Sequence, residues 1–273
     1  MAAPLVLVTG SSDGIGRETA CILAERGARV ILHGRDPQRL EAAAKAVDAR
    51  SGSWPVAQEL ADLASLETVR QLGARLLDEF PRIDVLVNNA GVIMPRRVLT
   101  PEGLETTFVV NHLAPLLLTH LLLPALTESP QGRIVNVSSG VQMGARLDWD
   151  NLQGEKHFES RGAYALSKLA NVLFTTELAR RLRSTGITVN ALQPGVVSTK
   201  LLRAGFGGHG SDSLAEGAAT SVHLALVPEG AQTTGAYFHR SKPLRTNPLA
   251  GERAVTSRFY ELSCQLVGIA PLP

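Results

Sequence analysis

The stretch LVLVTGSSDGIG, residues 5 to 16, decides the fold of this chain. It begins as a short run of branched apolar residues, typical of a buried strand, and continues into a loop with glycines at 10, 14 and 16. Such a loop lets the chain turn out of a strand, approach a pyrophosphate with its backbone and open a helix whose N–H groups favour an anion. The spacing is not GxGxxG, and ordinary strand-to-helix turns also use glycine. The loop therefore indicates a nucleotide site only through its position between a strand and a helix.

The rest of the chain repeats the alternation that this stretch begins. Further apolar runs are separated by amphipathic, helix-length segments. Strands that are apolar on both faces, with helical crossovers between them, predict a parallel sheet covered on both sides. We expect one α/β domain over residues 1–273, doubly wound, with a mostly seven-stranded parallel sheet. The six further runs lie at residues 29–33, 54–60, 83–89, 132–139, 187–193 and 235–239.

Composition argues against several classes of protein. The formal net charge is +2 without a basic block, which disfavours a nucleic-acid-binding protein. The two cysteines, Cys21 and Cys264, lie far apart, so we expect no disulfide framework and a reducing, cytoplasmic location. The seven histidines lack metal-binding spacing, and we expect no metal site.

Two apolar segments bear on a membrane location. The N-terminus has no basic region before its apolar run, and we read it as a strand and not as a signal. The segment LAPLLLTHLLLPAL, residues 113–126, is shorter than a bilayer-spanning helix and contains His120. We expect this segment to form a helix buried against the sheet or a neighbouring subunit, and we expect a soluble protein with no membrane anchor.

The end of the second apolar run bears on the choice of cofactor. The sequence there is LHGRD, with Gly34 at the strand end and Arg35 next. A dinucleotide site uses an acidic residue at this place for a ribose hydroxyl, or a cation for a 2′-phosphate. Arg35 favours NADP over NAD, although Asp36 one residue later leaves the ribose alternative open.

The stretch AYALSK, residues 163–168, places Tyr164 and Lys168 one helical turn apart. Alone, such a pair is more often a packed ring and a solvated charge than a catalytic pair. The motif NVSS, residues 136–139 at the end of a predicted strand, supports a catalytic interpretation of the pair, because ligands of parallel α/β sheets bind beyond the carboxyl ends of the strands.

Together with TGSSDGIG and NNAG (88–91), these motifs resemble the short-chain dehydrogenase/reductase family over nearly the whole chain, which implies a Rossmann fold. The resemblance implies that Tyr164 is the general acid/base and that Lys168 lowers its pKa and holds the nicotinamide ribose. It implies that Ser139 hydrogen-bonds the substrate oxygen and that Asn111 supports a proton-relay water. The implied cofactor-binding residues are Gly10, Ser12, Asp13, Gly14, Ile15, Gly16, Arg35, Asp62, Leu63, Asn89, Gly91, Tyr164, Lys168, Pro194, Gly195, Val197 and Thr199.

The 25-residue interval between Ser139 and Tyr164, with the insert DNLQGEK, is most similar to the retinol dehydrogenase and WW-domain oxidoreductase branch. This resemblance implies an NADP-dependent enzyme that interconverts a lipophilic aldehyde or ketone with its alcohol, and a homo-oligomer, either a dimer or a tetramer. The segment after Thr199 is short and glycine-rich, unlike that of the membrane-bound retinol enzymes. The resemblance therefore does not extend to retinol itself as the substrate.

Two segments interrupt the rhythm of strands and helices and are expected to be loops, residues 141–162 and 204–213. The second is a candidate lid within a substrate loop at about residues 200–215. The expected substrate wall comprises Val141, Met143, Leu147, residues 92–94 and residues 200–213.

Two alternatives to an enzyme of this family remain. A cofactor sensor or scaffold without turnover is expected to lack Tyr164, Lys168 or Ser139, all of which are present. A methyltransferase of similar fold has no use for the Tyr–Lys pair.

Overall fold

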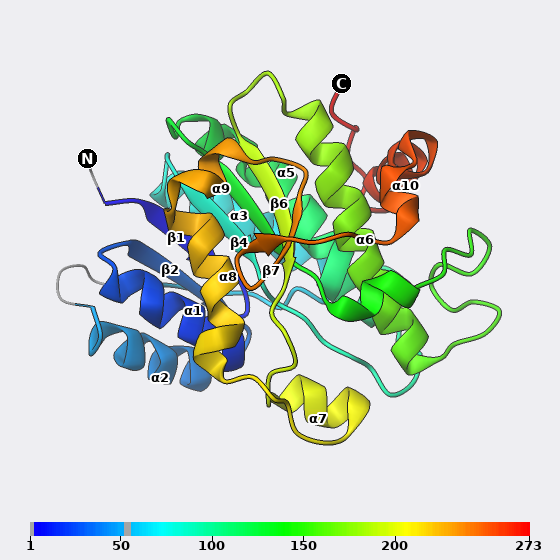
Figure 1. Ribbon diagram of the computed structural model, residues 1–273, viewed down its shortest axis with the longest axis horizontal. Coiled ribbons are helices and arrows are strands. Elements are labelled where there is room, and N and C mark those ends of the chain that lie inside the picture. Colours follow the sequence, from blue (N-terminus) through cyan, green and yellow to red (C-terminus); the bar gives the residue numbers. More distant parts are fainter. Residues whose placement is uncertain (1–2, 52–55) are drawn as a thin grey trace.

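The computed structural model describes residues 3–51 and 56–273 (Figure 1). Its strands form one sheet in the order β3-β2-β1-β4-β5-β6-β7-β8. Neighbouring strands from β3 to β7 pair in parallel, and the two-residue β8 adds an antiparallel edge. The bounds are β1 (Leu5–Val8), β2 (Arg29–Gly34), β3 (Ala57–Leu60), β4 (Val85–Asn88), β5 (Arg133–Val137), β6 (Thr188–Gln193), β7 (Tyr237–His239) and β8 (Lys242–Pro243).

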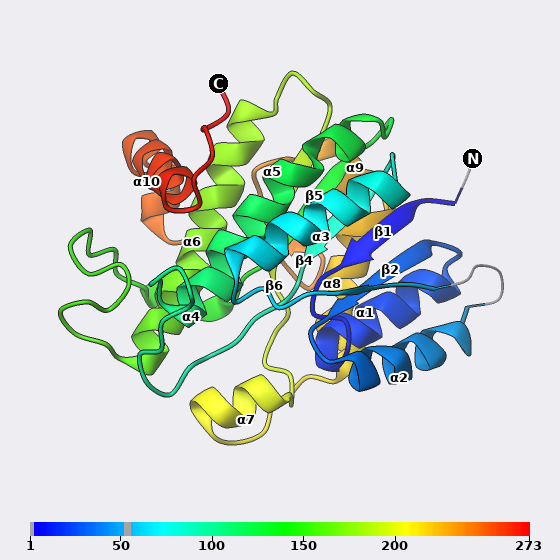
Figure 2. The ribbon, with the colours of Figure 1, turned by 180° about the vertical axis from the view of Figure 1, so that it is seen from behind.

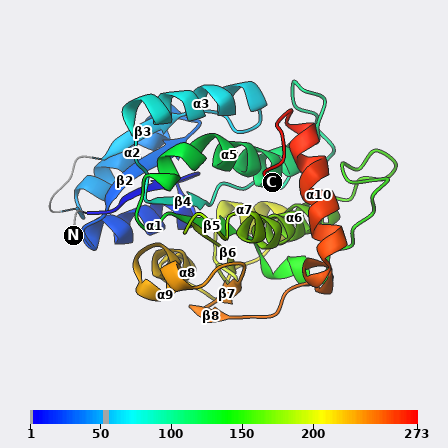
Figure 3. The ribbon, with the colours of Figure 1, turned by 90° about the horizontal axis from the view of Figure 1, so that it is seen from above.

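Helices cover both faces of the sheet (Figures 1, 2 and 3). One face carries α1 (Gly14–Glu25), α2 (Pro37–Asp48) and α8 (Leu214–Leu226), which share a hydrophobic core with the sheet. The other carries α3 (Leu66–Glu79), α5 (Ala114–Thr127) and α6 (Ser160–Arg181), with a second core. The outer helix is α10 (Arg253–Leu266), and the shorter elements are α4 (Thr106–Phe108), α7 (Lys200–Phe206), α9 (Pro228–Gln232) and 3₁₀ turns at Gly140–Gly144 and Pro248–Gly251.

The predicted doubly wound architecture is confirmed. The strand order reverses direction between β1 and β4, and this reversal is where open α/β sheets bind ligands. The predicted strand at 54–60 appears as β3, and residues 54–55 lie outside the described residues. The predicted loop 204–213 is wrong at its start, because α7 continues to Phe206.

The apolar segment 113–126 belongs to a longer helix than the sequence predicts. The helix is continuous from Thr106 to Thr127 through α4, a π-helical turn at Val109–Leu113 and α5. The side chain of Glu105 caps its start, accepting hydrogen bonds from two backbone N–H groups. By length and composition alone this 22-residue helix could cross a membrane, whereas the segment 113–126 by itself was expected to be too short. Within the described structure, 78% of its most apolar window is buried.

Candidate active site

A cavity of about 1160 Å³ opens at the carboxyl ends of the strands. It extends from the glycine loop after β1, past the ends of β4 and β5, to α7. Every cofactor-binding residue predicted from the sequence lines it. Of the four predicted catalytic residues, Ser139, Tyr164 and Lys168 line the cavity and Asn111 does not. Its volume exceeds the usual range for a single small ligand, which suits a dinucleotide together with a substrate.

The glycine loop is packed too tightly for side chains. Gly10 has a φ of +65°, and a Cβ there would lie 2.8 Å from the Cα of Ala90. A Cβ on Gly16 would lie 2.3 Å from the Nδ2 of Asn89 and 2.4 Å from the Gly10 carbonyl oxygen. Asn89 holds the loop by donating to the Thr9 carbonyl at 2.8 Å. The bare backbone at the start of α1 therefore fits a pyrophosphate.

Asp13 joins three elements around this loop. It caps α1 by accepting a hydrogen bond from the Gly14 N–H at 2.8 Å. The same side chain pairs with Arg39 on α2 at 2.6 Å and with Lys200 at the start of α7 at 2.8 Å. The hydrogen bond from Lys200 is the largest reason that the pKa of Asp13 falls to about 2. Asp13 is thus a carboxylate that links the nucleotide loop to α7.

The end of β2 presents cations to the cavity. Arg35 is exposed at the cavity edge. The Oδ1 of Asp36 accepts hydrogen bonds from the N–H groups of Gln38 and Arg39, and so caps α2. Asp36 does not line the cavity, so the geometry does not support the alternative in which this carboxylate binds the ribose hydroxyl of NAD.

His33 supports the glycine loop from β2. Its Nδ1 accepts a hydrogen bond from the Gly10 N–H at 3.2 Å, so Nε2 carries the proton and donates to the Ala61 carbonyl at 3.2 Å. Burial lowers the pKa of His33 to about 4. The ring is therefore a neutral positioning group at neutral pH.

The side chain of Asn111 lies behind the cavity wall. It sits in the π-helical turn and is fully buried. Its Nδ2 donates to the Val92 carbonyl and to the Ser167 hydroxyl, both at 2.9 Å, and its Oδ1 accepts from the Val92 N–H at 2.7 Å. The side chain therefore ties the loop after β4 to α6. A role in supporting a relay water stays a prediction.

Helix α6 brings Tyr164 and Lys168 together. Glu159 caps the helix, and the two side chains are 6% and 3% exposed. The Nζ of Lys168 donates to the Val137 carbonyl at 3.0 Å and lies 5.6 Å from the centre of the Tyr164 ring. Burial lowers the pKa of Lys168 to about 8.

The expected lowering of the Tyr164 pKa by Lys168 is not found. Burial raises the pKa of Tyr164 to about 12, and a hydrogen bond with Ser139 acts in the opposite direction. Removal of water from around the phenolate outweighs this hydrogen bond. The protein alone therefore keeps this phenol protonated.

The two serines at the end of β5 have different partners. Ser138 is buried and donates to the Lys168 carbonyl at 2.7 Å, which fixes α6 against the strand. Ser139 lines the cavity, and it lies near enough to the Tyr164 phenol to lower the pKa of that group by hydrogen bonding. Of the pair, Ser139 is thus the one placed to meet a ligand.

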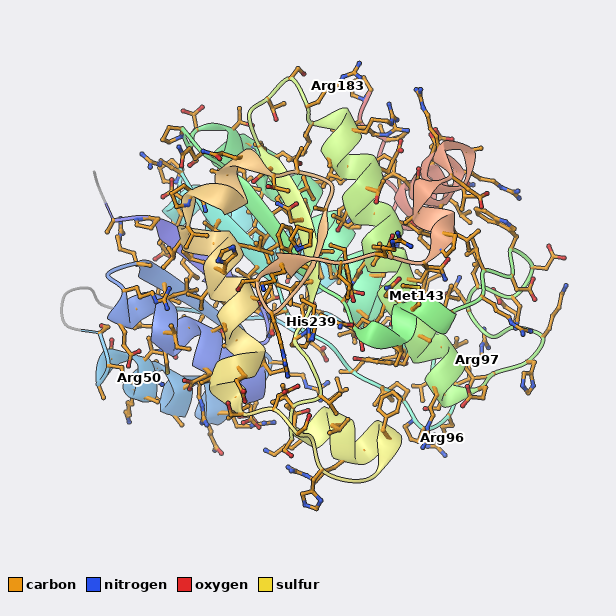
Figure 4. All side chains as sticks on the ribbon, viewed as in Figure 1. Arg50, Arg96, Arg97, Met143, Arg183 and His239 are labelled. Atoms are coloured by element: carbon orange, nitrogen blue, oxygen red, sulfur yellow. The ribbon has the colours of Figure 1, made fainter. Side chains whose placement is uncertain are left out.

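Sequence reasoning missed several cavity residues. Arg39 lies in the first turn of α2, only four residues after Arg35, and this nearness in sequence was a usable signal. His239, at the end of β7, also lines the cavity and appears in Figure 4 beside α8. Lys200 and Phe206 also line the cavity, and the sequence predicted them only as members of the range 200–213.

Two named residues of the expected substrate wall do not line the cavity: Met143 is 46% exposed, and Leu147 packs on the core. Within the expected range 200–213, five residues are also outside the lining, namely Arg203, Gly205, Gly208, Gly210 and Ser213.

Comparison with known proteins agrees with this geometry. The family model described as short chain dehydrogenase matches residues 4–206. Human retinol dehydrogenase 13 is 40% identical, with 97% of this chain and 84% of the relative covered. Bovine retinol dehydrogenase 12 is 40% identical, with 97% and 86% covered.

Solved structures share the fold. An uncharacterized protein from Mycobacterium paratuberculosis aligns with a TM-score of 0.81 and 31% identity, covering 100% of this chain and 96% of that one. RhlG of Pseudomonas aeruginosa, solved with NADP, aligns with a TM-score of 0.72 and 27% identity, covering 88% and 95%.

The chain therefore belongs to the short-chain dehydrogenase/reductase family of oxidoreductases. Within it, the chain is similar to retinol dehydrogenases 11 to 14, as the sequence predicted.

Proposed function

We propose that this chain is an NADP(H)-dependent enzyme that interconverts a lipophilic carbonyl compound with its alcohol, using Tyr164 as general acid/base. The observation that carries the proposal is the convergence of three polar groups on one cavity wall. The Tyr164 phenol, the Ser139 hydroxyl and the Lys168 ammonium lie in the cavity that also contains the glycine loop.

A nicotinamide held in this cavity would supply or accept the hydride. Ser139 is placed to hold the substrate oxygen next to Tyr164, which in reduction donates a proton to that oxygen. A pKa of about 12 keeps the phenol in the protonated state that reduction requires. Lys168, with a pKa of about 8, is mostly a cation at neutral pH and attracts an anionic or electron-rich group beside Tyr164.

The preference for NADP rests on the charges at the end of β2. Arg35 and Arg39 line the cavity there, and Asp36 is used to cap α2. Guanidinium groups suit a 2′-phosphate. Two relatives of known structure, RhlG and a short chain dehydrogenase from Shigella flexneri, were solved with NADP.

A lipophilic substrate is supported by the apolar part of the cavity near Tyr164, and by the names of the retinol dehydrogenases to which the chain is similar. The apolar lining residues include Val92, Ile93, Met94, Val141, Leu201, Leu202 and Phe206.

Three broader expectations are also proposals. The two free, buried cysteines, Cys21 and Cys264, support a reducing cytoplasmic location. The single sheet supports one domain over residues 1–273. A homo-oligomer is proposed from the family resemblance.

The test is a screen of aldehydes, ketones and quinones with NADPH and NADH measured side by side. We expect NADPH oxidation with lipophilic carbonyls and a weaker response with NADH. Tight NADPH binding with no turnover on any compound would contradict the enzyme and support a cofactor sensor.

A further inference from the structure

Helix α7 belongs to an excursion of the chain, here called the lid segment, residues 196–212. Its two ends meet, because the Asp212 N–H donates to the Val196 carbonyl at 3.0 Å and the Gly210 N–H donates to the Ser198 hydroxyl at 2.8 Å. A Cβ on Gly210 would lie 2.1 Å from the Val196 carbonyl oxygen, so only glycine permits this approach. In Figure 1 the helix stands apart from the layers of the fold.

None of the residues of α7 is buried, so the hydrophobic core does not determine where the helix lies. Polar contacts at its two ends hold it in place, together with the packing of Gly205 and Phe206 against Ile93 and Tyr164. At the first end, Lys200 pairs with Asp13 of the nucleotide loop at 2.8 Å. At the other end, the Nε of Arg161 donates to the Gly205 carbonyl at 3.1 Å, and its Nη2 donates to the Phe206 carbonyl at 3.4 Å. A guanidinium suits the free carbonyls at the end of a helix.

Arg161 also lies close to the reacting groups in sequence and in space. It is in the first turn of α6, three residues before Tyr164. Its guanidinium carbon lies 5.4 Å from the centre of the Phe206 ring. The Phe206 ring in turn meets the Tyr164 ring edge-on, with centroids 5.8 Å apart and an interplanar angle of 73°.

The end of α7 also closes against the loop after β4. A Cβ on Gly205 would lie 2.6 Å from the Cδ1 of Ile93, so the absence of a side chain allows the contact. Phe206 and Ile93 both line the cavity. An apolar wall therefore stands directly beside the Tyr164 phenol.

We propose that Phe206 is the specificity-determining residue of the substrate site and that Arg161 is its positioning residue. The proposal rests on the proposed function. The Phe206 ring packs against the Tyr164 ring and lines the same cavity, so we expect it to limit bulk next to the carbonyl carbon of a substrate held at Tyr164. The enzyme is expected to prefer an unbranched aliphatic aldehyde to a bulky aryl ketone.

The first experiment compares kcat/KM for hexanal and for acetophenone, with NADPH as cofactor. For Phe206→Ala we expect the acetophenone-to-hexanal ratio to rise by about tenfold or more, the scale on which apolar pocket contacts discriminate substrates. Arg161→Met is expected to shift the ratio in the same direction, with NADPH affinity unchanged. Arg203→Met is the control, because it removes an exposed arginine of α7 that lies outside the cavity lining, and it should leave the ratio as in the wild type. An unchanged ratio in Phe206→Ala, with both substrates still turned over, overturns the assignment of Phe206.

The second experiment does not depend on turnover. Amide hydrogen exchange across residues 200–206 is expected to be faster in Arg161→Met than in the wild type or in Arg203→Met. Equal exchange in all three proteins overturns the positioning role of Arg161. If the wild type reduces no carbonyl but exchange still responds to Arg161, the proposed function fails and the positioning role stands.

Discussion

The Nζ of Lys168 lies 5.6 Å from the centre of the Tyr164 ring and donates its hydrogen bond to the Val137 carbonyl. The ammonium is therefore held by β5, next to the phenol ring. Both groups are buried, which raises the pKa of Tyr164 to about 12 and lowers that of Lys168 to about 8. Desolvation moves each group toward its neutral form, and the pair suits proton donation to a carbonyl oxygen.

Replacing Tyr164 by phenylalanine should remove the proton donor and leave the ring packing intact. We expect kcat for carbonyl reduction to fall by about 10²-fold to 10⁴-fold, the usual contribution of a positioned acid or base. NADPH affinity, measured by fluorescence titration, should change little. Turnover close to that of the wild type would refute the assigned role of Tyr164.

Replacing Arg35 by alanine should weaken the preference for NADPH. Loss of one guanidinium–phosphate contact is expected to lower NADPH affinity by about tenfold or more and to leave NADH affinity nearly unchanged. Calorimetric titration with both cofactors measures the ratio. Arg26→Ala, at an exposed position outside the cavity, is the matched control. Equal losses for both cofactors would point to a structural role for Arg35.

Acid should destabilise the protein through its buried histidines. Burial lowers the pKa of His33 to about 4, of His112 to about 3 and of His120 to about 4. An unfolded chain takes up these protons below about pH 6.5, so stability falls as the pH drops from 6.5 toward 4. Each buried histidine is expected to lower the free energy of unfolding by about 2 kcal/mol between neutral pH and pH 5.

Urea unfolding at pH 7 and pH 5 measures this loss. In His33→Gln the difference between the free energies of unfolding at the two pH values should be smaller than in the wild type, by the contribution of one histidine. The low pKa of Asp13, about 2, places its effect below this window, because a depressed carboxyl pKa matters only below its ordinary value of 3.8. Identical differences in wild type and variant would contradict the assignment of a neutral His33.

Gly16→Ala should damage the nucleotide loop. The added Cβ would meet the Asn89 amide and the Gly10 backbone, so the loop must shift. We expect the free energy of unfolding to fall by about 1–3 kcal/mol and NADPH binding to weaken. Gly251→Ala, where a Cβ meets nothing within 4 Å, is the control. Thermal unfolding and cofactor titration of both variants distinguish a local clash from a general cost of replacing glycine.

Much of the fold could be predicted because buried parallel strands are continuous apolar runs. The pattern LVLVT located β1, and the same reasoning located the strands that pair with it. Residues that follow the carboxyl ends of these strands, such as Ser139 and Arg35, could be assigned to one edge of the sheet because the strands are parallel. Both residues line one cavity.

Other features depend on contacts that local patterns do not encode. The pairing of Asp13 with Lys200 joins residues distant in sequence. The direction of the Tyr164 pKa shift follows from burial depth, which packing around α6 determines. The hydrogen bonds of the buried Asn111 side chain depend on a π-helical turn, and the sequence has no simple pattern that predicts such a turn.

That turn makes the placement of Asn111 depend on the length of the chain at Val109–Leu113. It contains one residue more than a regular α-helical turn would use. A one-codon deletion there would let the helix close into regular α-helical turns, so α5 could keep its place against the sheet. The Asn111 side chain would shift away from Val92 and Ser167, so such a variant should fold but lose the tie between the loop after β4 and α6.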